Sequence, residues 1–156
     1  GADKLASEYS QKGDDYNALM VKLLADRLAE AFAEVLHKKV RREIWGYTPN
    51  EQCSIEDVFK EKYQGIRPAP GYPACPDHRQ KATIFSLLNA KENADIDLTK
   101  NMAMVPPASV SGYYFSHPQS KYFNVGKIDQ EQLEDYSQRM GDIVSETKKF
   151  IPNNVK

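Results

Sequence analysis

A proline-rich stretch from Gly65 to His78 holds the residues of this chain that are best suited to binding a small ligand. Four of the nine prolines fall in it, at positions 68, 70, 73 and 76. Each proline fixes its own φ and disfavours the helical conformation of the residue before it, so the spacing predicts a stiff, mostly extended loop. The loop carries the permanent cation of Arg67, the ring and hydroxyl of Tyr72, and the conformationally free Gly71. These groups suit a ligand with a carboxylate, a planar ring and polar edges; a purely structural connector is the alternative.

No other pattern in the sequence predicts a reactive centre. The chain lacks a nucleophile motif, a phosphate loop and a dinucleotide fingerprint. Its three histidines, His37, His78 and His117, are scattered and are interpreted as surface or capping residues. Cys53 and Cys75 are predicted to be free thiols. Cys75 and His78 have metal-ligand spacing but no second ligand pair, so no metal site and no catalytic residue are predicted.

Composition narrows the functional class further. The chain has 156 residues and a net charge of −1, which predicts one domain, or a substantial piece of one, without the basic surface typical of nucleic-acid binding. No apolar run approaches 18 residues, so no membrane span is expected. The first residues lack the pattern of a signal peptide, and a cytoplasmic location is expected. Residues 1–13 are interpreted as a tag remnant and flexible N-terminus, and residues 14–156 as the folded part.

Helical periodicity and capping residues predict five helices. The longest covers about residues 15–44 with Asp14 or Asp15 as its N-cap, and its apolar residues recur at steps of three and four. A short helix follows Ser54, and another, over about 78–89, follows Asp77. The last two cover about 130–140, between Asp129 and Gly141, and about 143–150.

Strand-forming residues cluster between these helices. Residues 96–99 form one predicted strand, and residues 109–115 and 122–128 are predicted to pair as an antiparallel hairpin. Five aromatic residues lie in this hairpin, and half of them would face outward beside the loop as a stacking wall for a purine: Tyr113, Tyr114, Phe115, Tyr122 and Phe123. The order of elements predicts an α+β fold with a long N-terminal helix, an antiparallel hairpin or sheet, and C-terminal helices.

The long helix also carries a row of carboxylates. Asp26, Glu30 and Glu34 follow one another at four-residue steps, where like charges repel by a few tenths of a kcal/mol per pair. Such a row predicts either a solvated face or a surface whose partner needs hydrogen-bond acceptors.

Several of these segments together resemble a known family. The run Arg67-Pro-Ala-Pro-Gly71-Tyr72-Pro-Ala-Cys-Pro-Asp-His is similar to the S-adenosylmethionine loop, Arg-x-x-x-Gly-Tyr, of the activation domain of cobalamin-dependent methionine synthase. Further similar segments run from about Asp14 to the C-terminus and include residues 24–34, Trp45-Gly-Tyr, residues 108–112 and residues 115–122. The resemblance implies a C-shaped α+β domain that binds S-adenosylmethionine.

The resemblance also implies roles for single residues. Arg67, Gly71, Tyr72 and the backbone near Ala74 would bind the ligand. Two further residues, Tyr122 and Phe123, match a Tyr-Tyr pair that lines the ligand in relatives, so the second hydroxyl is missing here. Two carboxylates, Asp26 and Glu30, match residues that face the cobalamin domain and receive a histidine displaced from cobalt.

The family's chemistry sets the expected cofactors and partners. Methionine synthase moves a methyl group from methyltetrahydrofolate to homocysteine through cobalamin, which a different domain carries. When cobalamin is oxidised, the activation domain supports its reductive methylation by S-adenosylmethionine, with an electron from flavodoxin or a related flavoprotein. The family's activation domain is about twice as long as this chain, and its N-terminal half contributes an acidic ligand contact. A free-standing ligand-binding or regulatory half-domain is therefore the alternative function.

Overall fold

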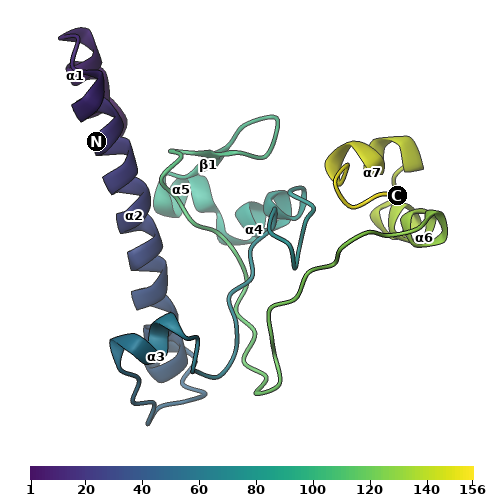
Figure 1. The fold of residues 1–156 in the computed structure, drawn as a ribbon. Coiled ribbons are helices and arrows are strands. Elements are labelled where there is room, and N and C mark those ends of the chain that lie inside the picture. The colour runs from purple at the N-terminus through teal and green to yellow at the C-terminus, as the bar shows by residue number, and fades with distance from the viewer. The chain divides into compact units, whose positions relative to one another are not determined.

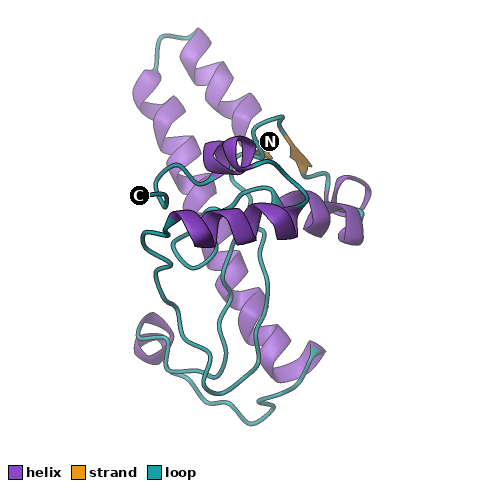
Figure 2. Cartoon of the chain, turned by 90° about the vertical axis from the view of Figure 1, so that its right-hand side faces the viewer, coloured by secondary structure: helices purple, strands orange, loops and turns teal.

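The computed structural model describes residues 1–156 and divides them into two compact units. Unit 1 consists of Gly1–Gln64 and Phe85–Val110, and unit 2 of Gly65–Ile84 and Ser111–Lys156. Figure 1 labels the elements, and Figure 2 shows that helices and long loops dominate. The elements are α1 (Ala2–Gln11), α2 (Asp15–Lys39), the π-helix η1 (Val40–Ile44), α3 (Ile55–Phe59), α4 (Gln80–Leu88), α5 (Ala90–Ala94), β1 (Asp97–Leu98), β2 (Met104–Val105), α6 (Gln130–Met140) and α7 (Val144–Phe150). The fold is α+β, as predicted.

The N-terminus is helical, which corrects the prediction of a flexible segment over residues 1–13. Helix α1 contacts α2, and Ala6 is only 1% exposed. The polar composition of α1 hid this packing, because a single small buried residue leaves little apolar signal in the sequence. Gly13, with φ +76°, separates α1 from α2, and Asp14 caps α2 by accepting a hydrogen bond from the Asn17 amide.

The long helix extends as predicted but turns its apolar residues mainly to solvent. Helix α2 continues through the wider turns of η1, so that helical structure covers residues 15–44. Its buried residues are the small Ala18 and Ala33 and the polar His37. A run of large apolar side chains along it is exposed: Leu24, Leu28, Phe32 and Val35.

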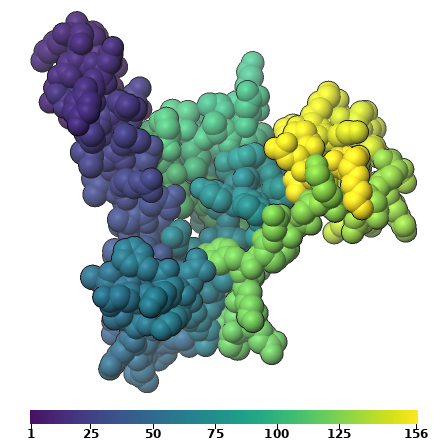
Figure 3. Space-filling view, viewed as in Figure 1, coloured from purple at the N-terminus to yellow at the C-terminus, as the bar shows by residue number.

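In unit 1, the chain that follows η1 packs back against the C-terminal end of α2. Tyr63 packs edge-on against the fully buried His37, with ring centroids 5.2 Å apart, and Arg41 lies over the same tyrosine ring at 3.9 Å. In Figures 1 and 3 this following segment, which contains α3, lies against the end of the long helix. Helix α3 begins at a capping box formed by Ser54 and Asp57, which confirms Ser54 as its cap.

The sheet is smaller than expected, and its first strand lies within the predicted strand of residues 96–99. Strands β1 and β2 form an antiparallel pair, with Asp97 opposite Val105 and Leu98 opposite Met104. The predicted hairpin of residues 109–115 and 122–128 is wrong, since each segment forms its backbone hydrogen bonds with a different part of unit 2. The carbonyls of Ile66, Pro68 and Pro73, in the proline-rich loop, accept backbone amides from the two segments.

The C-terminal helices agree with the prediction. Asp129 caps α6 in a capping box with Gln132, and Gly141 ends the helix with φ +72°. The only large apolar side chains that unit 2 buries are those of Ile84, Leu133 and Ile151. Helix α4 buries Lys81 together with Ile84, while Leu87 is 79% exposed. None of the helices combines the length and the apolar character that crossing a membrane requires.

Candidate ligand-binding site

The proline-rich loop of unit 2 is held on one side by the segment before residue 116. Ile66 and Phe115 exchange two backbone hydrogen bonds of 3.0 Å, and the Tyr113 amide donates to the Pro68 carbonyl at 2.9 Å. Gly112 lies so close that a Cβ there would stand 2.6 Å from the Pro68 oxygen. Residues 66–68 therefore run antiparallel to residues 113–115, and this approach requires glycine at position 112.

The middle of the loop is a tight turn. The Gly71 amide donates to the Cys75 carbonyl at 2.7 Å, and the Cys75 amide donates to the Tyr72 carbonyl at 2.9 Å. Gly71 has φ +98°, and a Cβ on it would overlap the His78 imidazole. The backbone conformation and the neighbouring ring thus both require glycine at this position.

The aromatic segment after residue 121 holds the other side of the loop. The Tyr122 hydroxyl accepts a hydrogen bond of 2.9 Å from the Arg67 amide. Three residues further on, the Val125 amide donates to the Pro73 carbonyl at 3.0 Å. The loop is therefore fixed between two extended segments by backbone and side-chain hydrogen bonds, which explains how a stretch without regular secondary structure keeps one shape.

The predicted ligand residues lie together in unit 2. Arg67 and Tyr122 are in direct contact, and Gly71, Tyr72 and Ala74 belong to the turn that follows Arg67. Three aromatic rings are left accessible: Tyr72 is 59% exposed, Tyr122 40% and Phe123 62%. Exposed rings next to a guanidinium and backbone carbonyls are the groups that bind a planar heterocycle with a charged tail.

Sequence reasoning did not single out the pair His78 and Lys81. Lys81 is 6% exposed, and its Nζ lies 3.0 Å from His78 Nδ1. Partial burial of the ring and the charge of Lys81 lower the pKa of His78, and burial lowers the pKa of Lys81. The pair thus lies behind the Gly71 turn with a neutral imidazole, and the spacing of three residues between His78 and Lys81 was the only signal in the sequence.

The carboxylates Asp26 and Glu30 lie one helical turn apart on α2, in unit 1, and both are exposed. Such a pair forms an accessible acidic surface on a rigid helix. Elsewhere, both cysteines are free thiols, and burial raises the pKa of Cys75. No three histidine, cysteine or acidic side chains are grouped so that they could hold a metal ion.

Comparisons with known proteins place these features in context. The family model described as "Vitamin B12 dependent methionine synthase, activation domain" matches residues 1–141. A solved structure described as "Crystal Structure of the MetH Reactivation Domain bound to AdoHcy" is 55% identical in sequence and superimposes with a TM-score of 0.95. The match covers 99% of this chain and 47% of the other, so this chain spans about half the length of that relative.

Proposed function

We propose, because this chain belongs to the activation-domain family of vitamin B12-dependent methionine synthases, that its proline-rich loop binds S-adenosylmethionine for reactivation of that enzyme. One observation carries the proposal: the Arg67 amide is hydrogen-bonded to the Tyr122 hydroxyl, which joins the two segments that carry the predicted ligand residues. The relative bound to AdoHcy, the demethylated form of S-adenosylmethionine, supports this ligand class.

Each residue has a distinct proposed role. The Arg67 guanidinium would pair with the ligand carboxylate, an interaction that a planar bidentate donor favours. The turn at Gly71 would bring the backbone of Tyr72 and Ala74 close to the adenosine. The exposed rings of Tyr122 and Phe123 would contact the adenine, and exposed aromatic rings favour such stacking.

The proposed partner is the cobalamin-binding domain of methionine synthase. S-adenosylmethionine would supply the methyl group for reductive methylation of the cobalamin, and flavodoxin or a related flavoprotein would supply the electron. The exposed carboxylates of Asp26 and Glu30 support a docking role for α2, because they provide hydrogen-bond acceptors on a rigid surface. We infer that this chain serves a methyltransferase of cytoplasmic methionine synthesis and that it does not catalyse the methyl transfer by itself.

Calorimetric titration with S-adenosylmethionine tests the proposal directly. We expect saturable binding, and we expect Arg67→Ala to weaken it by at least about 1.5 kcal/mol, the low end for hydrogen bonds to charged groups. Arg42→Ala is the matched control, since Arg42 is an exposed arginine in η1 of unit 1. Equal affinities of Arg67→Ala and the unsubstituted chain would remove Arg67 from the site.

The free-standing half-domain remains the alternative function, and docking separates it from the first proposal. A purified cobalamin-binding domain should bind this chain, and Asp26→Asn together with Glu30→Gln should weaken that complex without changing affinity for S-adenosylmethionine. Tight ligand binding without any docking would favour the free-standing regulatory role.

A further inference from the structure

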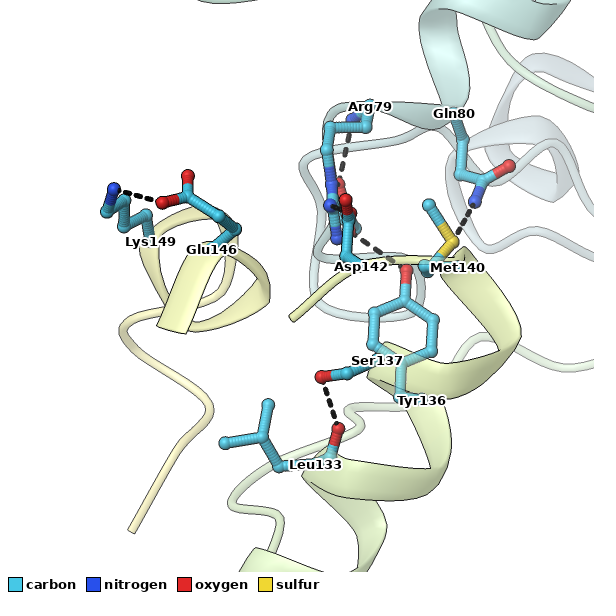
Figure 4. Close-up of polar contacts among 10 residues, drawn as sticks. Arg79, Gln80, Leu133, Tyr136, Ser137, Met140, Asp142, Glu146 and Lys149 are labelled. Carbon is cyan, nitrogen blue, oxygen red and sulfur yellow. Dashed lines mark hydrogen bonds and ion pairs between the residues drawn. The ribbon is translucent and has the colours of Figure 1, made fainter. Parts of the chain in front are cut away.

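A buried carboxylate at the end of the proline-rich loop connects the loop to α6. Asp77 is only 3% exposed and accepts hydrogen bonds from the Arg79 side chain at 2.6–3.1 Å. The Tyr136 hydroxyl, from α6, donates to the same carboxylate at 2.9 Å. Figure 4 shows the Arg79 and Tyr136 side chains pointing toward one another at this junction.

The Arg79 guanidinium extends the connection to the last residues of the chain. It also pairs with Asp142, just after α6, and its central carbon lies 4.4 Å from the centre of the Phe150 ring in α7. One planar cation thus binds two carboxylates and stacks on an aromatic ring, a combination for which arginine is better suited than lysine.

The charge states at neutral pH favour this arrangement. Burial alone would raise the pKa of Asp77, but hydrogen bonds from Arg79 and Tyr136 hold the pKa below its usual value. Burial and the hydrogen bond to Asp77 raise the pKa of Tyr136 to about 12. The carboxylate therefore stays ionised and the phenol stays a donor throughout the physiological range.

A second attachment lies at the end of the aromatic segment. The Ile128 amide donates to the Asn154 carbonyl at 2.6 Å, and the Lys156 amide donates to the Ile128 carbonyl at 3.2 Å. The Asn154 side-chain amide donates to the Gly126 carbonyl at 2.8 Å. The last residues of the chain therefore hold both segments that carry the predicted ligand residues.

Short and stiff connections join both attachments to the proposed ligand site. Only Pro76, with its fixed φ, separates Asp77 from Cys75, whose carbonyl and amide close the turn with Gly71 and Tyr72. On the other side, Gly126 directly follows Val125, whose amide binds the loop. A displacement at either attachment would therefore be transmitted to the ligand residues.

We propose that Tyr136, Asp142, Phe150 and Asn154, here called the C-terminal anchor, are positioning residues that hold the loop and the aromatic segment in the geometry that binds S-adenosylmethionine. The inference rests on the proposed function. It also goes beyond the family match, which ends at residue 141 and so leaves out three of these four residues. None of the four belongs to the predicted ligand contacts, so they act through Asp77 and Gly126.

The test uses the whole chain with the substitutions Tyr136→Phe and Asn154→Ala, singly and together. Each removes one hydrogen bond while leaving the ligand residues unchanged. We expect each to weaken S-adenosylmethionine binding about threefold and the double variant about tenfold, since the two attachments are independent. We also expect faster hydrogen exchange at the Gly71 amide, because its acceptor, the Cys75 carbonyl, would be less well held.

A matched control separates positioning from general stability. Leu133→Val removes one buried methylene from α6, where Leu133 is 1% exposed, without touching either attachment. At a temperature where every variant is fully folded, this control should bind with unchanged affinity and show an unchanged Gly71 exchange rate. If Leu133→Val and Tyr136→Phe lost equal affinity for S-adenosylmethionine, the anchor would act only through general stability, and the proposal would be overturned.

The two readouts distinguish this inference from the proposed function. A folded, unsubstituted chain that fails to bind S-adenosylmethionine would overturn the proposed function, whereas the Gly71 exchange rate would still test the anchor. Unchanged exchange in the double variant would overturn the anchor, whatever the affinity of the unsubstituted chain.

Discussion

Each of the two units of this chain contains an arginine held by a carboxylate and an aromatic ring. The two clusters differ in the sequence separation of the residues that they join and in the exposure of the arginine. In unit 1 the Arg41 side chain is fully buried, binds both oxygens of Glu51 at 2.7 and 2.8 Å, and lies over Tyr63. In unit 2 the Arg79 side chain is 12% exposed and is shared between Asp77 and Asp142.

From this difference we expect the Arg41 cluster to stabilise unit 1 and the Arg79 cluster to position the proline-rich loop. The Arg41 cluster joins Arg41, Glu51 and Tyr63, which lie close together in sequence. The Arg79 cluster joins residues 77 and 150, at the end of the proline-rich loop. Both units bury few large apolar side chains, so bidentate pairing and stacking of a guanidinium replace part of an apolar core.

The largest expected effect is that of Arg41→Leu. The substitution leaves the Glu51 side chain, only 7% exposed, as an unpaired buried charge, which costs about 3–5 kcal/mol. Chemical denaturation should show a loss of this size in the free energy of unfolding. The double variant Arg41→Leu with Glu51→Leu should recover most of it. A loss no larger than that of the exposed Arg42→Ala would show that the Arg41 cluster does not stabilise unit 1.

A smaller and local effect is expected for Gly112→Ala. Its Cβ would stand 2.6 Å from the Pro68 carbonyl, and relief of the overlap must move one of the two backbones, at a cost of about 1–3 kcal/mol. We expect weaker S-adenosylmethionine binding by calorimetry, with the denaturation signal of unit 1 unchanged. Lys121→Ala, at an exposed position nearby, is the control and should bind normally. Unchanged affinity of Gly112→Ala would contradict the proposed site.

Acidification should destabilise both clusters. Against the effect of burial, hydrogen bonds from Arg41 lower the pKa of Glu51 in the folded state, and those from Arg79 lower that of Asp77. In acid the unfolded chain therefore binds more protons than the folded chain does. The stabilisation by the two carboxylates is complete above about pH 4.5, and it is lost as the pH falls through their lowered pKa values in the folded state. Chemical denaturation at several pH values should show this fall in the free energy of unfolding. The double variant Arg41→Leu with Glu51→Leu should have a shallower slope; an identical slope would exclude the Glu51 contribution.

The smallest effect is expected for Arg139→Ala. Arg139 pairs with Asp135 at 2.6 Å on α6, but both side chains are more than 60% exposed, so the ion pair contributes less than about 0.5 kcal/mol. Thermal denaturation should barely change. If Arg139→Ala lowered the free energy of unfolding as much as Arg41→Leu, the exposure of an arginine would not predict how much it stabilises this fold.

Helices α3 and α6 could be predicted from their ends, whereas α1 and α5 were not predicted. Asp129 and Gly141 mark the limits of α6, and Ser54 marks the start of α3, because side-chain caps and left-handed glycines act within a few residues. The stiff loop could also be predicted, since proline spacing restricts a loop locally, and its ligand residues stay a prediction. That Arg67 and Tyr122 lie in contact, 55 residues apart, was expected only from the resemblance.

The pairing of extended segments could not be predicted in the same way. Residues 109–115 have strand-forming side chains, but partner choice depends on which carbonyls another segment leaves free, and here the loop provides them. The burial of Lys81 and the exposure of Leu28 also run against the local sequence pattern.

The capped helices, the stiff loop and the glycine turn follow from the local sequence, because φ restrictions and capping hydrogen bonds involve residues that are close in the chain. The tertiary structure decided which segments pair with the loop, and how Asp77 and Gly126 are attached to the last residues of the chain. Those contacts depend on long-range hydrogen bonds and burial, which no local pattern encodes.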